Sequence, residues 1–173
     1  MSFHTPVNST SPKPGDSATN FDLLPRYLDS LSLVERLHRL LLDVIKDEFE
    51  RLSVLDINAV QALLLFNVAD NEVTAGELKS RGYYQGSNVS YNVKKLVEMG
   101  FLHHARSRVD RRSVRISLTT EGQEVHDIVA ALYEKHVLTV EQIGGIGTDE
   151  FNRINQTLAR LERFWTDQIR YRL

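Results

Sequence analysis

Apolar residues recur at three- and four-residue steps over most of this chain, and this spacing is typical of amphipathic helices. A first helix is predicted to begin at Ser32, because Ser32 and Glu35 have the spacing of a capping box, and its apolar stripe continues to Phe49. A second helix is predicted to begin at Asp56. The pattern therefore predicts a largely helical protein.

The middle of the chain is predicted to hold two more helices. Thr74 and Glu77 form a second capping box, which opens a short third helix that ends near residues 81–82. A fourth helix is predicted over residues 87–99, with Gly100 as its left-handed terminator.

The spacing then changes from a helical to an alternating pattern. A strand is predicted over residues 102–107, followed by an arginine-rich turn at residues 108–112. In the return strand, apolar Val114, Ile116 and Leu118 alternate with polar residues, as expected for a half-buried hairpin.

Two long helices complete the pattern. Thr120 and Gln123 open a fifth helix, residues 144–147 break it with three glycines, and Thr148 starts a last helix that reaches the C-terminus. The apolar face of this last helix is more than a small domain needs for its own core, so it predicts a partner helix. That face is formed by Phe151, Ile154, Leu158, Leu161 and Trp165.

Positive charge is concentrated in one segment. Residues 79–115 hold nine Lys and Arg against two acidic residues, a net +7, whereas the whole chain has a net charge of −2. The remainder must therefore carry −9, and the basic segment is predicted to attract a polyanion.

Composition excludes several classes of protein. The chain has no cysteine, which excludes disulfides, thiolate metal sites and thiol redox sensing. Its longest apolar run is far shorter than a membrane span, and its N-terminus lacks the pattern of a secretory signal, so we expect a cytoplasmic protein with no membrane contact. Residues 1–20 are rich in Ser, Thr and Pro and are predicted to form a disordered tail.

The fourth helix has two chemically different faces. Val89, Val93, Leu96 and Val97 share one side, and amide, phenol and ammonium groups share the other, which is what a helix needs to enter a DNA major groove. The alternative is a solvated polar face beside a solvated charge run. The candidate DNA-binding residues are Ser87, Asn88, Ser90, Tyr91, Asn92, Lys94 and Lys95 on the helix and Arg108, Arg111 and Arg112 in the turn.

No pattern indicates catalysis, a metal or a cofactor. The histidines lack the spacing of four that places two ligands on one helix face, and His103 and His104 are strand neighbours on opposite faces. The glycine run at residues 144–147 follows a helix and lacks the ending of a phosphate loop. We therefore expect a protein that is not an enzyme.

With this order of elements, the chain resembles the MarR family of bacterial winged-helix regulators over residues 30–173. The resemblance is carried by Asp110-Arg111-Arg112 and the segment 114–119, VRISLT, which match the family's wing signature. The segments RGYYQGSNVSYNVKKLVEMGF and RFWTDQIRYRL are most similar to the LdtR branch, named for regulating an L,D-transpeptidase gene.

The resemblance implies a mainly α fold with a small β-hairpin wing. A winged helix-turn-helix lobe at about residues 54–119 joins a helical dimerisation region at about 21–53 and 120–173, all within one domain, 21–173. It implies a homodimer, built from the first, fifth and sixth helices, on a palindromic double-stranded operator. In the wing, Asp110 would pair with Arg112, which leaves Arg108 and Arg111 for DNA.

The resemblance also implies control by a small aromatic or phenolic effector. The predicted contacts are His38, Ile45, Leu63 and Phe66, for which the alternative is that all four simply belong to the core or to an interface. The function predicted is a ligand-responsive transcription factor, and the alternative is a non-enzymatic protein-interaction module on the same scaffold. Salt-dependent binding to a palindromic duplex separates the two, because phosphate contacts release counterions.

Overall fold

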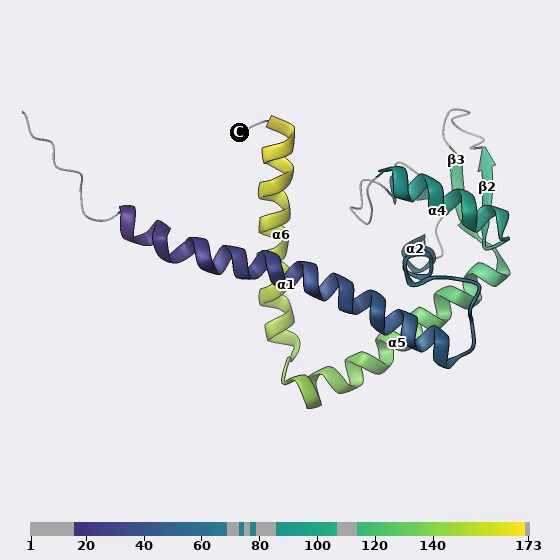
Figure 1. Ribbon diagram of the computed structural model, residues 1–173, viewed down its shortest axis with the longest axis horizontal. Helices are drawn as coiled ribbons and strands as arrows, with labels where there is room; N and C mark the ends of the chain where they lie inside the picture. The colour runs from purple at the N-terminus through teal and green to yellow at the C-terminus, as the bar shows by residue number, and fades with distance from the viewer. Residues whose placement is uncertain (1–15, 69–72, 75–76, 79–85, 107–113, 172–173) are drawn as a thin grey trace, which may run out of the picture. The chain divides into compact units, whose positions relative to one another are not determined.

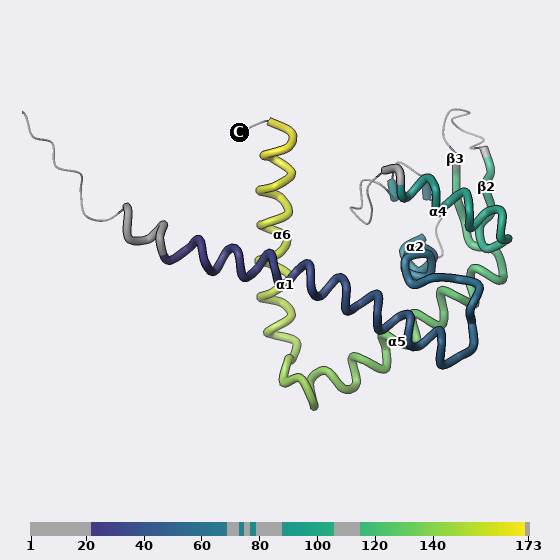
Figure 2. The backbone as a smooth tube through the Cα atoms, in the orientation of Figure 1, coloured from purple at the N-terminus to yellow at the C-terminus, as the bar shows by residue number. Residues whose placement is uncertain are grey.

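The computed structural model describes residues 16–68, 73–74, 77–78, 86–106 and 114–171, whose backbone is coloured in Figure 1. It divides into two compact units, residues 1–44 and residues 45–173, and each is treated by itself. Figure 2 follows the same backbone as a tube.

The first unit is formed by most of helix α1, which spans Asp16–Arg51. The predicted start at Ser32 is wrong, since Ser32 lies exposed within this helix. Leucines at helical spacing continue upstream of Ser32, and an ion pair joins Asp22 to Arg26 one turn later (3.4 Å). The helix runs on through Pro25 in this segment. Residues 16–20 of the predicted tail belong to this helix, and residues 1–15 lie outside the described residues.

Helix α2 spans Ala59–Val68, so the predicted start at Asp56 is wrong. Asn58 is the cap: its Oδ1 accepts from the backbone N–H of Gln61 (2.9 Å), and its own N–H donates to Oε1 of Gln61 (3.1 Å). Asn is as good a cap as Asp, and only Asn58 has a glutamine three residues later to complete the reciprocal pair.

The capping box at Thr74 and Glu77 is confirmed. The N–H of Thr74 donates to Oε2 of Glu77 (2.6 Å), and the N–H of Glu77 donates to Oγ1 of Thr74 (3.1 Å). Residues 77 and 78 are helical, and the predicted end at residues 81–82 lies outside the described residues. Thr74 also belongs to strand β1, Val73–Thr74, which the sequence pattern did not predict.

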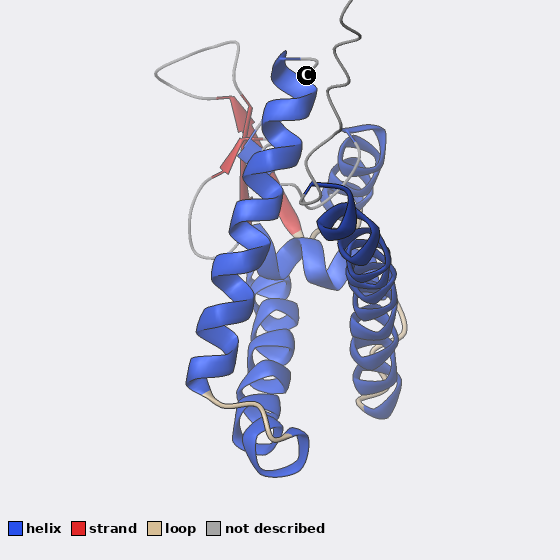
Figure 3. Cartoon of the chain, turned by 90° about the vertical axis from the view of Figure 1, so that its left-hand side faces the viewer, coloured by secondary structure: helices blue, strands red, loops and turns tan. Residues whose placement is uncertain are grey.

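The predicted hairpin is confirmed, as strands β2 (Leu102–Arg106) and β3 (Val114–Leu118) pair antiparallel. The register runs from Leu102 opposite Leu118 to Arg106 opposite Val114. Strand β1 pairs with the other edge of β3, which gives the order β1-β3-β2 in the small sheet of Figure 3. The predicted turn at residues 108–112 lies outside the described residues.

The remaining helices agree with the sequence pattern. They are α4 (Gly86–Glu98), α5 (Thr120–Gly144) and α6 (Thr148–Tyr171). One correction concerns α5: its cap is Thr119, whose extended backbone (φ −85°, ψ 179°) turns its hydroxyl toward the N–H of Gly122. At the other end Gly145 adopts a left-handed conformation (φ +65°) and stops the helix, as the glycine run predicts.

The core of the second unit lies where α2 packs against α5, with α4 on one side and the sheet beside them (Figure 1). Burial of these apolar side chains is the main force that holds α4 and the hairpin in place. The largest fully buried side chains are Ile45, Leu64, Leu65, Val68, Val73, Val89, Leu96, Ile116 and Val129.

Candidate nucleic-acid interface

Helix α4 has the two faces that its sequence predicts. Val89 and Leu96 have no exposed surface. On the opposite side Asn88, Tyr91 and Lys95 are exposed, and Tyr91 keeps 62% of its surface. The apolar face fixes the helix to the core, so the polar face is presented by a rigid element.

The end of α4 is closed by backbone hydrogen bonds. Gly100 has φ +83°, and its N–H donates to the carbonyl of Val97 (3.1 Å). The N–H of Phe101 donates to the carbonyl of Leu96 (2.9 Å), which completes a Schellman motif. A residue with a Cβ is strained at this φ, so Gly100 sets the direction in which the chain leaves the helix.

Two contacts on α4 limit what its polar side chains can do. Lys94 lies 3.8 Å from Glu98, but both side chains are more than half exposed, so the pair is weak and Lys94 keeps its access to an anion. The Nδ2 of Asn92 donates to the backbone carbonyl of Asn88 (3.0 Å). Asn88, Tyr91 and Lys95 therefore carry the least constrained polar groups of this exposed face.

The structure brings together on α4 most of the predicted helix residues: Asn88, Ser90, Tyr91, Asn92, Lys94 and Lys95. The side chain of Ser87 lies outside the described part of the chain. So do the wing residues Arg108, Asp110, Arg111 and Arg112, and their predicted pairing and DNA contacts stay predictions.

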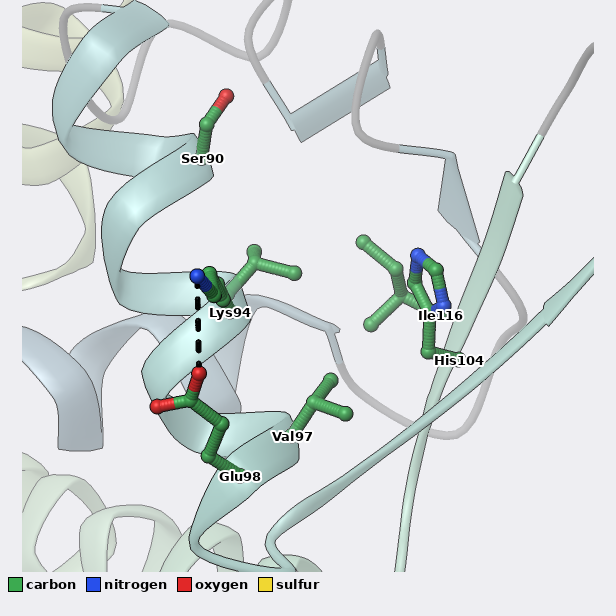
Figure 4. A pocket seen from close by; sticks show the side chains of 7 residues that line it. Ser90, Lys94, Val97, Glu98, His104 and Ile116 are labelled. Carbon is green, nitrogen blue, oxygen red and sulfur yellow. Dashed lines mark ion pairs between the residues drawn. The ribbon is translucent and has the colours of Figure 1, made fainter.

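A cleft of about 450 Å³ separates α4 from the hairpin, as Figure 4 shows. Apolar side chains of both elements meet polar groups at its edge. His104, which the sequence pattern raised only as a metal candidate, lies across the cleft from Lys94, a position that strand alternation could have found. The lining residues are Ser90, Val93, Lys94, Val97, Glu98, His104 and Ile116.

The predicted effector residues have different surroundings. Ile45 has no exposed surface and Leu63 is 8% exposed, so both are core residues in this structure. Phe66 is half-buried and contacts two rings of α5: it stacks on His126 (centroids 5.2 Å apart) and meets Tyr133 edge-on (5.0 Å). Burial raises the pKa of the Tyr133 phenol. His38 belongs to the other unit and is exposed.

The described ranges hold neither a cluster of metal ligands nor a membrane-spanning helix. Within residues 16–68, 86–106, 114–171 and the two short stretches between them, no three His, Asp or Glu side chains gather as a metal site would require. Over the same residues, no helix combines the length and the hydropathy needed to cross a bilayer.

Comparisons with known proteins agree with this geometry. A family described as a winged helix DNA-binding domain matches residues 57–122. The exopolysaccharide II synthesis transcriptional activator ExpG of Rhizobium meliloti (strain 1021) is 31% identical over an alignment 173 positions long, which covers 96% of this chain and 87% of ExpG.

Solved structures share the fold at lower identity. The transcriptional regulator SlyA has a TM-score of 0.67 at 20% identity, with 84% of this chain and 99% of SlyA covered. FabT of Streptococcus pneumoniae, in complex with DNA, has a TM-score of 0.63 at 19% identity, with 82% and 98% covered. A mutant MarR from E. coli, complexed with operator DNA, has a TM-score of 0.61 at 20% identity, with 80% and 97% covered.

These findings define a winged-helix, DNA-binding transcriptional regulator. The chain belongs to the same family as the transcriptional activator ExpG, and it has the fold of the MarR regulator.

Proposed function

We propose that this regulator binds a palindromic operator as a homodimer and inserts α4 of each copy into the major groove. The carrying observation is the helix itself, whose buried face anchors it while Asn88, Tyr91 and Lys95 stay exposed. FabT and MarR, which share the fold, were both solved with DNA. In such a site amides contact base edges and ammonium groups contact phosphates.

Dimerisation is supported by the apolar surface of the two last helices. No residue of α6 is buried, although Phe151, Ile154 and Leu158 repeat along one face. Val137 and Leu138 near the end of α5 keep 70% and 72% of their surface. A cleft of about 350 Å³ lies between α5 and α6, at the bend that joins the two helices. Apolar surface of this extent marks an interface, and a second copy satisfies it symmetrically.

Phosphate contact and base recognition are assigned to different residues. We assign Lys94, Lys95 and the wing residues Arg108 and Arg111 to phosphates, because their charge acts on any sequence. Asn88 and Tyr91, with Ser87, Ser90 and Asn92, are assigned to the bases and the adjacent sugar and phosphate groups. Asp110 and Arg112 are assigned to holding the wing.

An aromatic or phenolic effector is the proposed regulator of DNA binding, acting in the cytoplasm. This proposal is supported by the cluster of aromatic rings that Phe66, His126 and Tyr133 form between α2 and α5. The aromatic ring of an effector would stack on these side chains or meet them edge-on. A compound that binds more tightly to a conformation that does not fit the operator lowers the affinity of the protein for DNA. The ratio of the compound's affinities for the two conformations sets the size of this loss. Phe66→Ala should abolish release of DNA by phenolic acids, whereas release that is identical in this variant contradicts the placement.

The target genes are proposed to serve the cell envelope. The resemblance to the LdtR branch implies cell-wall remodelling genes such as those for L,D-transpeptidases, and the relative ExpG is named for activating exopolysaccharide synthesis. Sequencing the genomic fragments that the protein retains would test this assignment. Fragments without envelope genes nearby would contradict it.

The decisive experiment is selection of duplexes from a randomised library, followed by binding measurements at several salt concentrations. We expect a palindromic duplex, a steep salt slope, and a smaller slope for Arg111→Ala, since each phosphate that is no longer neutralised lowers the slope by about 0.9. Asn88→Ala should keep the slope and lose preference for the selected sequence. Selection of no sequence, or binding that salt leaves unchanged, contradicts the proposal.

A further inference from the structure

Thr119 joins two helices through one hydroxyl group. As the cap of α5, its Oγ1 accepts from the N–H of Gly122 (3.0 Å). The same hydroxyl donates to the carbonyl oxygen of Gly100 (2.7 Å), and the backbone N–H of Thr119 donates to the carbonyl oxygen of Phe101 (3.2 Å). Capping α5 requires only the first of these bonds, so the bond to Gly100 needs another explanation.

The contact is also unusually close. A Cβ added at Gly122 would lie 2.1 Å from the carbonyl oxygen of Phe101, a distance too short for any side chain. The first turn of α5 therefore rests directly on the backbone that follows α4. Gly100 and Phe101 are themselves held by the carbonyls that end α4. In Figure 1 the end of α4 and the start of α5 meet below the hairpin.

We propose that this junction of Gly100, Phe101, Thr119 and Gly122 is a positioning element that sets the spacing of half-sites the dimer accepts. The inference rests on the proposed function, because spacing has meaning only for a dimer on a palindrome. The helix α5 leads into α6, through which the two copies associate. The angle between α5 and α4 therefore sets the distance and the rotation between the two recognition helices, α4 of each copy. One added base pair displaces a half-site by about 3.4 Å and rotates it by about 34°.

The test separates the positioning bond from the cap. Thr119→Asp keeps an acceptor for the N–H of Gly122, and Asp is a favourable cap, but a carboxylate cannot donate to the carbonyl of Gly100. Thr119→Ser keeps both bonds and is the matched control. Each protein is titrated by fluorescence anisotropy against the selected palindromic duplex and against duplexes with one base pair added or removed between the half-sites. Circular dichroism and thermal unfolding check that each variant is folded.

Wild type and Thr119→Ser should lose about tenfold or more in affinity when the spacing changes, an energy difference of about 1.4 kcal/mol. Thr119→Asp should lose less than about threefold, because its recognition helices can adjust. A cap with no positioning role would instead lower affinity equally at every spacing. Should Thr119→Asp fail to fold, Gly122→Ala carries the same comparison, since its methyl group must displace α5 from Phe101.

The outcomes keep the two proposals apart. If wild type selects no palindrome, the proposed function fails and this inference fails with it. If wild type discriminates between spacings and Thr119→Asp retains the full penalty, the positioning role is overturned while the regulator remains.

Discussion

Helices α4 and α6 are the two strongly amphipathic helices in the described part of this chain, yet their apolar faces differ in how deeply they are buried. Helix α4 buries Val89 and Leu96 completely, within its own chain. Helix α6 buries nothing: Ile154 keeps 45% of its surface and Leu158 keeps 43%. Amphipathic spacing therefore predicts that a helix has a partner, but it does not predict whether the partner belongs to the same chain.

This difference in burial assigns the two apolar faces to different properties, the stability of the fold and the association of two copies. The apolar face of α4 contributes to folding of the lobe, and its polar face is left for DNA in the binding mode we propose. The apolar face of α6 is left for a second copy, in the dimer we propose. Substitutions on the apolar face of α4 should therefore lower the stability of the fold, whereas those on the apolar face of α6 should lower the association of two copies.

The largest effect is expected from Ile154→Asp combined with Leu158→Asp. In an isologous dimer the two substitutions bury four unpaired carboxylates, which should leave the protein monomeric at micromolar concentration. A monomer holds the operator through one half-site instead of two linked half-sites, so binding should weaken by about 100-fold or more. Sedimentation velocity and anisotropy measure the two effects.

The control is Gln156→Asp, which adds one carboxylate per chain on the opposite face of α6. It should stay dimeric and bind the operator normally. A doubly substituted protein that sediments as wild type does would refute the assignment of this face to the dimer.

Leu96→Ala should have the next largest effect, on stability. Leu96 is fully buried, so the cavity left by its truncation should cost about 2–5 kcal/mol of the free energy of unfolding. Urea unfolding followed by circular dichroism measures this cost. Lys94→Ala is the control on the same helix, and it should change stability by no more than about 0.5 kcal/mol. Equal losses in the two variants would mean that α4 does not pack against the core through Leu96.

The smallest effect is expected from Lys95→Ala, on the polar face of α4. Its stability should match wild type, and its salt slope for DNA should fall by about 0.9 for each phosphate that Lys95 neutralises. Lys135→Ala, which removes an exposed lysine from α5, is the control and should keep the full slope. An unchanged slope in Lys95→Ala would remove this residue from the interface.

The sequence by itself determined the elements whose signals are local. The faces of α4, its end at Gly100, the two strands of the hairpin and the start of α6 were all predicted correctly, because each depends on residues within a turn or two. Where two local signals competed, the sequence was less decisive. Ser32 has the spacing of a cap but lies within α1, and Asn58 rather than Asp56 caps α2.

Only the tertiary structure decided the features that join distant residues. Strand β1 has two residues, too few for any periodicity, and it exists because Val73 pairs with Ile116. The stacking of Phe66 on His126 joins α2 to α5, and the bond from Thr119 to Gly100 spans 19 positions. Such contacts depend on how packed elements approach one another, which the spacing of residues along one element does not encode.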